Sequence, residues 1–188
     1  MKKYKKLSTI LSLTSSVALL STTSFISSCS ASGNRIVYDG AEYSLPSDIN
    51  PNIFASEFPW TIKTTSGSTI TINDVSKLTS VIIQSCKSGV ESIEDNFLFG
   101  CTHLNYLYLS GLSNVRHIGD NFLQDCTGLT NIDLSMFTKL VRVGENFLAD
   151  CNNVGFTSLD LNSLKNLATI GIGFLRWWCN LTSVKFSK

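Results

Sequence analysis

Cysteine is the residue type in this 188-residue chain that could do the most chemistry, and its spacing is regular. Cys101, Cys126 and Cys151 recur at equal intervals. A cysteine acts as a nucleophile only as an exposed thiolate with a base beside it. His103 lies two residues from Cys101, but the sequence indicates no Asn or Asp that would orient it. We therefore predict that the protein is not an enzyme and has no catalytic residues.

The sequence also lacks the residue patterns that a metal site or a cofactor site requires. The chain has two histidines and no CxxC pair, so its cysteine spacing matches no zinc site. No glycine-rich phosphate-binding loop is present. We expect neither a metal site nor a cofactor.

The three cysteines belong to a longer repeat. A Phe-Leu pair precedes each of them by the same interval, within DNFLFGC, DNFLQDC and ENFLADC, and a degenerate copy reads IGFLRWW. The first three pairs are equally spaced and the last follows after a slightly longer interval, at Phe97-Leu98, Phe122-Leu123, Phe147-Leu148 and Phe174-Leu175. A repeat of this length indicates stacked units that share one core.

Each repeat contains one predicted strand and one crossing segment. Apolar residues alternate with polar ones after each Phe-Leu pair, as at Leu107 and Leu109, which is typical of a half-buried strand. In the third copy Leu159 and Leu161 arrive two residues late, which predicts a small insertion near Gly155-Phe156. The crossing segments have apolar residues at three-residue spacing and end at Gly119, Gly144 and Gly171.

Acidic residues stand just before the Phe-Leu segments, at Asp95, Asp120 and Glu145. We expect a short helical turn there, with these carboxylates as N-caps that accept its free N–H groups. A ladder of calcium sites is the alternative, but each repeat supplies only one such acid.

Stacking of these units predicts a leucine-rich-repeat solenoid of about four to five turns, with a ribbon of parallel β-strands on one side and short helical or 3-10 turns on the other. It also places Cys101, Cys126 and Cys151 in one internal column, where a small, polarisable side chain suits a narrow core. Buried free thiols are the favoured state. Disulfides between neighbouring turns are the alternative, although three thiols would leave one unpaired.

The motif IG-D-N-F-L-x-x-C-x-x-L-x-x-I-x-L-S is similar to the BspA-like leucine-rich repeats of bacterial and protozoan surface proteins. The resemblance covers Leu78 to Lys188 and depends on several fixed offsets that recur together. It implies a surface protein that takes part in adhesion.

The last repeat departs from this motif, because Trp178 stands at the cysteine position and Cys179 follows it. We predict that Trp177 and Trp178 close the end of the solenoid with bulky side chains. A cage for a ligand is the alternative. The final strand could also pair with another copy, so self-association through the C-terminal repeat is a second hypothesis.

Residues 1–28 have the features of a secretory signal peptide, with a basic start, an apolar run and small residues at the end. Ser and Thr interrupt the apolar run, which disfavours the alternative of a transmembrane anchor. Removing the four lysines of this segment from the 15 basic residues leaves 11 against 14 acidic ones, a net charge of −3. A weakly acidic chain without a basic run is not expected to bind nucleic acid.

Ile26-Ser27-Ser28-Cys29 resembles the lipobox of bacterial lipoproteins, in a Ser-rich form similar to that of wall-less, AT-rich bacteria. The resemblance implies that Cys29 carries a lipid, that residues 29–34 form a tether, and that the protein is anchored at the extracellular face of the cell membrane. An ordinary secreted cysteine is the alternative.

Residues 35–74 do not repeat, and we predict that they form a β-rich N-terminal cap before the repeats of residues 75–188. RIVYDGAEYSL indicates a hairpin with a turn at Tyr-Asp-Gly. A carbohydrate-binding module with Trp60 and Tyr38 as its aromatics is the alternative, although about 40 residues bury only a small core.

Residues between the buried positions of each strand face outward and stack in columns on the ribbon. Aromatic anchors in a polar neighbourhood are typical of protein-recognition surfaces. The candidate protein-binding residues are Ile82, Tyr106, Tyr108, Asp133, Asp160 and Lys185. The main hypothesis is a membrane-anchored scaffold that binds a surface protein of a host or neighbouring cell. The alternatives are a self-associating structural protein and a shortened, non-binding member of a longer repeat family.

Overall fold

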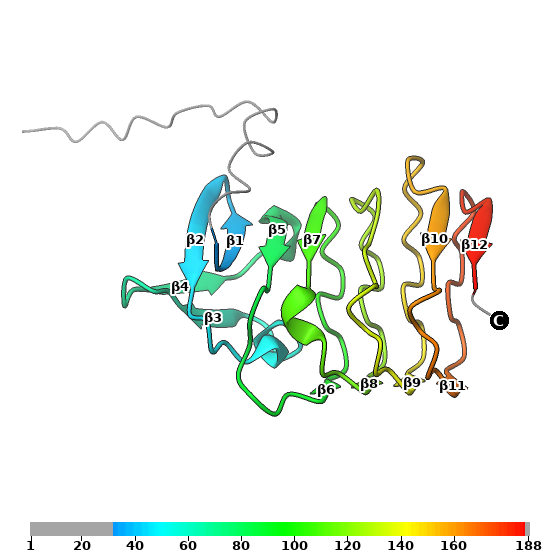
Figure 1. Ribbon diagram of the computed structural model, residues 1–188. Coiled ribbons are helices and arrows are strands. Elements are labelled where there is room, and N and C mark those ends of the chain that lie inside the picture. Colours follow the sequence, from blue (N-terminus) through cyan, green and yellow to red (C-terminus); the bar gives the residue numbers. More distant parts are fainter. Residues whose placement is uncertain (1–31, 187–188) are drawn as a thin grey trace, which may run out of the picture. The chain divides into compact units, whose positions relative to one another are not determined.

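The structure, a computed structural model, describes residues 32–186. They fold as one compact unit, a β-solenoid of about four turns preceded by a β-rich N-terminal region (Figure 1). The predicted fold class is confirmed. No helix among the described residues is long and apolar enough to cross a membrane. The predicted signal peptide and Cys29 lie outside the described residues.

Short parallel strands form the predicted ribbon on one side of the solenoid. In register, Ser80 pairs with Tyr106 and Ile82 with Tyr108, while Asp160 pairs with Lys185 further along. Apolar residues between these positions, such as Leu107 and Leu159, are buried. The ribbon strands are β5 (Leu78–Ile82), β7 (Tyr106–Tyr108), β10 (Ser158–Asp160) and β12 (Ser183–Lys185).

A second parallel sheet, which the sequence did not predict, forms where each crossing segment meets its glycine. Its strands follow one another through the solenoid in the order β6, β8, β9, β11. Each strand has only two residues, and the apolar residue of the first three points into the core. The strands are β6 (Ser92–Ile93), β8 (His117–Ile118), β9 (Arg142–Val143) and β11 (Thr169–Ile170).

The predicted helical turn at the Phe-Leu segments is wrong. In the second copy Asn121, Leu123 and Asp125 all have left-handed backbone conformations, with φ of 59°, 55° and 61°. These left-handed residues alternate with residues of negative φ, so the N–H groups of Asn121 and Leu123 point to the coils on opposite sides. Asn121 N donates to Glu145 O of the following coil at 2.8 Å, and Leu123 N donates to Phe97 O of the preceding coil at 2.9 Å. The segment is therefore a ladder between coils, and no helix forms.

The predicted N-caps at Asp95 and Asp120 are also wrong, because these carboxylates bind the following coil. Asp95 Oδ1 accepts a hydrogen bond from Asp120 N at 2.8 Å, and Asp120 Oδ1 accepts one from Glu145 N at 2.7 Å. The neighbouring asparagines form a parallel ladder, in which Asn121 Nδ2 donates to Asn96 Oδ1 at 2.9 Å. These polar groups link one turn of the solenoid to the next.

A stack of phenylalanine rings runs through the core along the solenoid axis. Phe97 and Phe122 lie 5.3 Å apart between ring centroids with an interplanar angle of 9°, and Phe122 and Phe147 lie 5.1 Å apart at 7°. Phe174 continues the stack at 5.4 Å from Phe147. Aromatic pairs contribute about 0.5–1.5 kcal/mol each beyond their buried area. The repeating phenylalanine thus fixes the register of consecutive coils.

The insertion in the third copy lies where the sequence predicted it. Phe156 is buried, and its ring meets that of Trp178 edge-on at 4.5 Å between centroids. Val154, seven residues after Phe147, is 83% exposed, whereas Leu129, seven residues after Phe122, is buried. The two extra residues loop out, and Phe156 takes the core position that Leu129 holds in the preceding coil.

The N-terminal region contains the predicted hairpin. Strands β1 (Asn34–Tyr38) and β2 (Ala41–Leu45) pair antiparallel around Asp39-Gly40, whose φ angles of 49° and 77° fit a two-residue hairpin turn. β1 also pairs antiparallel with β5, so the hairpin continues the ribbon. Asn34, placed in the predicted tether, is the first residue of β1 and hydrogen-bonds the backbone at Pro46 and Ser85.

The rest of this region packs against the first coil. Phe54 covers the phenylalanine stack, with its ring 6.2 Å from that of Phe97. Trp60 and Tyr38, the aromatics of the alternative carbohydrate module, are buried at 4% and 8% exposure, which leaves them no face for a sugar. The elements are η1 (Pro51–Phe54), β3 (Trp60–Lys63), β4 (Thr69–Ile72) and η2 (Val75–Lys77), and a further 3-10 turn η3 (Ser110–Leu112) follows β7.

Gly144→Ala should destabilise the protein strongly. A Cβ at this position would lie 2.6 Å from the carbonyl carbon of Gly119 and 2.7 Å from Asp120 N, so two backbones would have to separate. Overpacking of this kind costs about 1–3 kcal/mol or more. We expect a clear fall in the thermal unfolding midpoint, measured by circular dichroism.

Gly155→Ala is the matched control. Its Cβ would meet only side-chain atoms, the nearest being Asn153 Oδ1 at 3.3 Å. An equal fall in the unfolding midpoint for the two substitutions would contradict the view that backbone contact between coils allows only glycine at position 144.

Candidate functional site

The ribbon brings the predicted binding residues onto one face, and β7 carries its most exposed aromatic side chains. Tyr106 is 45% exposed and Tyr108 is 36% exposed. Because both belong to a strand whose intervening residue, Leu107, is buried in the core, their positions are fixed by the backbone. Ile82 is 5% exposed, so the accessible part of the predicted surface consists of the other five residues.

The middle of the ribbon does not form a regular strand. Residues 131–134, between β7 and β10, are outside any strand. Asp133 Oδ1 accepts a hydrogen bond from Ser135 N at 2.8 Å, and Asp160 Oδ1 accepts one from Asn162 N at 2.9 Å. Aspartate side chains that bind nearby N–H groups compete with sheet hydrogen bonds. Each aspartate therefore caps the turn that begins two residues after it, where its coil leaves the ribbon face.

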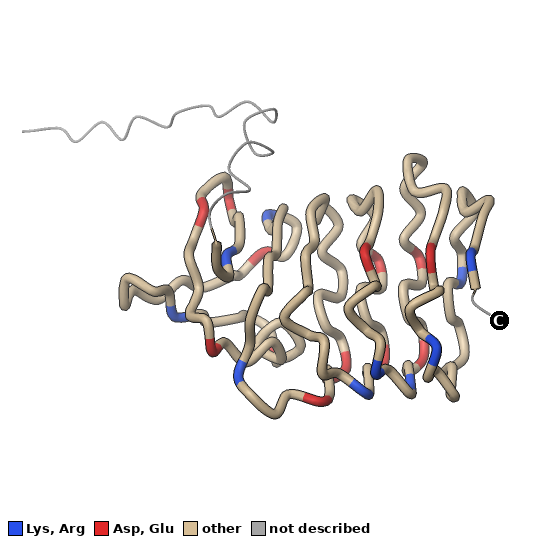
Figure 2. The backbone as a smooth tube through the Cα atoms, in the orientation of Figure 1, with Lys and Arg blue, Asp and Glu red and all other residues tan. Residues whose placement is uncertain are grey.

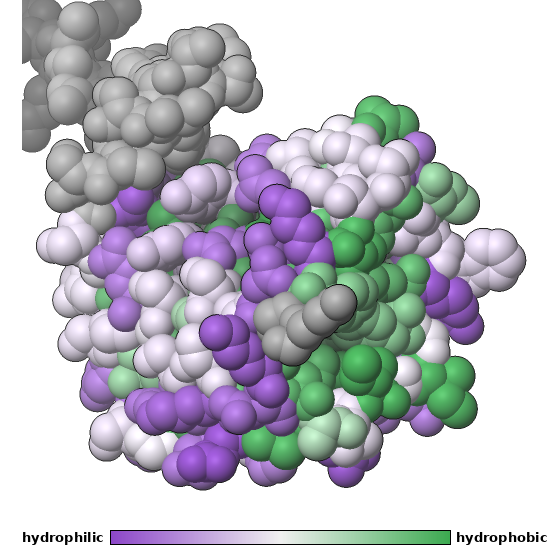
Figure 3. Space-filling model, turned by 45° about the vertical axis from the view of Figure 1, so that its right-hand side comes forward, coloured by the Kyte–Doolittle hydropathy of each residue, from purple (hydrophilic) through white to green (hydrophobic). Residues whose placement is uncertain are grey.

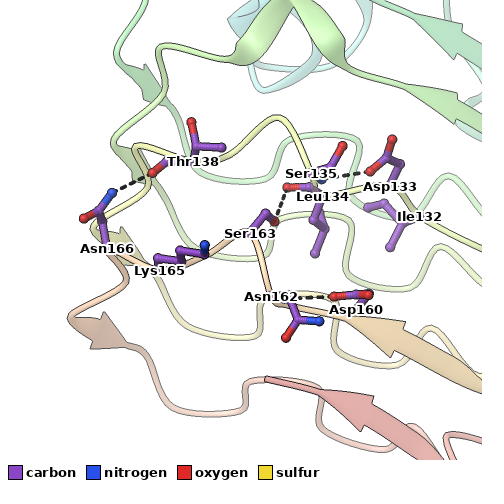
Figure 4. A pocket seen from close by; sticks show the side chains of 10 residues that line it. All are labelled: Ile132, Asp133, Leu134, Ser135, Thr138, Asp160, Asn162, Ser163, Lys165 and Asn166. Carbon is purple, nitrogen blue, oxygen red and sulfur yellow. Dashed lines mark hydrogen bonds between the residues drawn. The ribbon is translucent and has the colours of Figure 1, made fainter. Parts of the chain in front are cut away.

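A cavity of about 580 Å³ opens between these two coils (Figure 4). Two hydrogen bonds join its sides from side chain to backbone: Ser163 Oγ donates to Leu134 O at 2.9 Å, and Asn166 Nδ2 donates to Thr138 O at 2.7 Å. Both predicted aspartates line it. Its lining residues are Ile132, Asp133, Leu134, Ser135, Thr138, Asp160, Asn162, Ser163, Lys165 and Asn166.

The charges of this region are not neutralised by ion pairs within the described residues. The ion pairs found there join Lys77 to Asp39, Arg116 to Glu91 and Arg176 to Asp150. Asp133, Asp160, Lys165 and Lys185 take part in none of them. Figure 2 shows the acidic end of β10 beside the basic end of β12, which are Asp160 and Lys185 in register. The face thus offers both signs of charge to a partner.

Sequence reasoning found the aspartates but missed the cavity and the residues of the crossing segment that line it, such as Ser163 and Lys165. A signal was present in the sequence. The interval from Phe147 to Phe174 is two residues longer than the intervals between the earlier phenylalanines. This longer coil supplies Asp160, Asn162 and Ser163 to the cavity, and the regular coil before it supplies the other side.

The cysteine column is buried, as the sequence predicted. Cys126 Sγ donates to Leu98 O and Cys151 Sγ donates to Leu123 O, each at 3.1 Å. Burial raises the pKa of Cys101 and of Cys151 to about 12 and raises that of Cys126 well above its usual value. This is the opposite of the low pKa that makes a thiol reactive.

His103 is exposed, and Thr102 Oγ1 lies 3.2 Å from its Nδ1. Cys101 is fully buried, so the sequence neighbours do not share an accessible site. No group of three or more metal-binding side chains occurs among residues 32–186. The column is a packing feature of the core.

The comparison with known families decides the identity of the repeat. The family described as BspA type leucine rich repeat region matches residues 72–188 in six copies. The chain belongs to this family. No curated protein and no solved structure matches it.

The BspA-type repeats account for the geometry of the ribbon face. A leucine-rich-repeat solenoid is typically a non-enzymatic scaffold for protein interactions, in which the buried repeat positions build the frame and the outward positions vary. In this chain the repeat positions are the phenylalanines, cysteines and glycines. The outward positions of β7, β10 and β12 differ from coil to coil, which is what a binding surface requires.

Thiol labelling should separate the column from the other cysteines. At pH 8 in residues 32–188, DTNB should modify the exposed Cys179 first and the half-buried Cys86 more slowly. The three column thiols should react only after denaturation, because a pKa of about 12 leaves roughly one thiol in 10⁴ ionised at that pH. Rapid reaction of three or more thiols in the native protein would contradict this assignment.

Proposed function

We propose that the protein is a membrane-anchored surface lipoprotein that binds a protein of a host or neighbouring cell through the ribbon face. The observation that carries the proposal is the pair of exposed tyrosines on β7, one coil away from the cavity that Asp133 and Asp160 line. The BspA-type repeats support a scaffold role, and the resemblance of those repeats to surface proteins supports adhesion.

The ribbon face suits a protein partner for three physical reasons. Tyrosine supplies a large contact area and a hydroxyl with only two rotatable bonds, so little entropy is lost on binding. The cavity one coil away from the tyrosines can receive side chains of the partner. The carboxylates of Asp133 and Asp160 and the ammonium group of Lys185 can fix its orientation, since they hold no ion pair among the described residues.

The solenoid also limits the cost of binding. Tyr106 and Tyr108 flank Leu107, which is buried in the same continuous core as the phenylalanine stack. A backbone held in this way needs no rearrangement when a partner docks, and preorganised surfaces lose less free energy to ordering. This is the advantage of a repeat scaffold over a flexible loop.

Tyr106→Ala with Tyr108→Ala should weaken binding at least tenfold, because aromatic anchors near the centre of an interface often contribute about 2 kcal/mol or more. The partner is first found by panning residues 32–188 against surface and matrix proteins of candidate host cells. Affinity for the captured protein is then measured by surface plasmon resonance.

Phe99→Gln is the matched control for this experiment. Phe99 is 43% exposed, close to the value for Tyr106, but it lies in the Phe-Leu segment and not on the ribbon. Gln is the residue at the same repeat position in the next coil, Gln124. Unchanged affinity of the tyrosine variant, or an equal loss in the control, would exclude the ribbon face as the binding surface.

Membrane attachment through Cys29 is tested separately in the full chain. Cys29→Ser should abolish incorporation of an alkyne-labelled fatty acid and should release the protein from the washed membrane fraction of an expressing bacterium. Ser28→Ala, which keeps a small residue before Cys29, is the control and should be labelled normally. A Cys29→Ser protein that still incorporates the fatty acid would exclude this lipidation site.

A further inference from the structure

The last coil departs from the repeat at the positions where one coil binds the next. Ile172 stands at the position that Asp95, Asp120 and Glu145 occupy in the preceding coils. In those coils the aspartates accept a backbone hydrogen bond from the coil that follows. Gly173 stands where the asparagine ladder would continue. The last coil therefore offers no side-chain acceptor to a further coil at these two positions.

A third departure replaces charge with an aromatic ring. Trp177 stands at the position of Asp125 and Asp150, and it keeps their left-handed backbone, with φ of 58°. The polar contacts that join coils inside the solenoid are thus replaced at its end by apolar surface.

This end of the solenoid is strongly apolar. Ile172 is 80% exposed, Trp177 66%, Phe186 65% and Ile170 50%. Figure 3 brings this end forward and shows hydrophobic residues gathered on it. Solenoids normally end in a repeat with a polar outer face, because an uncovered apolar end is poorly soluble. The last coil of the described chain has the opposite composition.

Both sheets also end here with an open strand edge. Among the described residues, β12 pairs only with β10, and β11 pairs only with β9. An open edge presents a row of unpaired N–H and C=O groups, which is a template for another strand. An occupant of this end must satisfy a strand edge as well as cover the apolar side chains.

We propose that a second copy of this chain covers this end, with the two last coils related by a two-fold axis. A two-fold axis normal to the ribbon, passing midway between the two Val184 residues, would pair β12 antiparallel with its copy. Val184 would then face Val184, and Lys185 would face Ser183 of the other copy. The two lysines are not directly opposed, so the pairing brings no like charges face to face.

The other end of the same ribbon shows that an antiparallel partner fits its edge. There β1 pairs antiparallel with β5 over four residue pairs. The second copy would pair antiparallel with the edge strand β12, as the N-terminal hairpin pairs with β5 at the other end of the ribbon. Arg176, the other cation in the described part of the last coil, is already paired with Asp150 at 3.7 Å.

The area of this end is sufficient for a stable dimer. Aromatic side chains bury about 150–250 Å² each, so the exposed fractions of Trp177, Phe186, Ile172 and Ile170 with the half-buried residues around them give on the order of 700 Å² per copy. A standard protein interface buries about 800 Å² on each partner. A two-fold arrangement is closed, so it stops at two copies.

Analytical ultracentrifugation of residues 32–188 tests the proposal. This segment contains the whole described core, so it is expected to fold without residues 1–31. We expect a dimer at micromolar concentrations that does not grow further when the protein is concentrated. A protein that is still monomeric at about 100 μM would overturn the proposal, because the dissociation constant of a dimer with a standard interface lies well below that concentration. Mass that rises without limit would overturn the two-fold geometry, because head-to-tail contacts give open filaments.

Two substitutions that restore the repeat residue make the test specific. Ile172→Asp and Trp177→Asp each introduce the residue found at the same position in earlier coils, so they are compatible with the fold. Each should weaken dimerisation at least tenfold with an unchanged thermal unfolding midpoint of the monomer. Phe99→Gln removes an exposed aromatic elsewhere and should dimerise as the parent does. Dimerisation unaffected by both aspartates would overturn the proposal.

The strand register is tested by crosslinking in a Cys179→Ser background. Val184→Cys should form an oxidised dimer readily, because directly opposed residues in antiparallel strands lie about 4.5–5.5 Å apart between Cα atoms. Ser183→Cys should not, because its copy would lie two residues away along the strand. Equal crosslinking of the two variants, or none of either in a protein that dimerises, would overturn the antiparallel pairing.

Discussion

The solenoid depends on the direct approach of one backbone to the next. At Gly144 a single added carbon would lie 2.6 Å from the carbonyl carbon of the preceding coil's Gly119, so only hydrogen fits between the two chains. The same approach lets Leu123 N and Asn121 N reach carbonyl oxygens in opposite neighbours. It also stacks the phenylalanine rings closely along the axis. Because this spacing repeats, each residue type that satisfies it must recur once in every coil, which is what makes the sequence periodic.

The periodicity explains which parts of the fold could be predicted. Fixed offsets placed strands β7, β10 and β12, the buried cysteine column and the insertion at Phe156, since burial alone dictates those residue types. The Phe-Leu segment could not be read correctly. An Asp-Asn pair before an apolar residue is equally suited to capping a helix and to bridging two coils, and Leu123 carries no sign of its left-handed backbone. Only the neighbouring coil, which is distant in sequence, decides between them.

The ribbon face shows the same limit. The outward columns follow from strand alternation, so the exposure of Tyr106 and Tyr108 could be expected. The cavity could not, because it arises where Asp133 and Asp160 turn their oxygens to their own backbone and a longer coil lies beside a regular one. Its lining includes Ser163 and Lys165, which lie outside any strand. The cavity thus forms where the repeat is imperfect, and the residues that line it are not those of the consensus.

The last coil extends this reasoning to the end of the described chain. A repeat position that binds the next coil is under two constraints, one from its own fold and one from its neighbour. At Ile172 and Trp177 the second constraint has changed, since apolar side chains replace the acids that served a following coil. If the end met only water, polar residues would serve there at no cost to the core, because these side chains are 80% and 66% exposed. Apolar residues at positions that the fold leaves open are best explained by a partner that covers them.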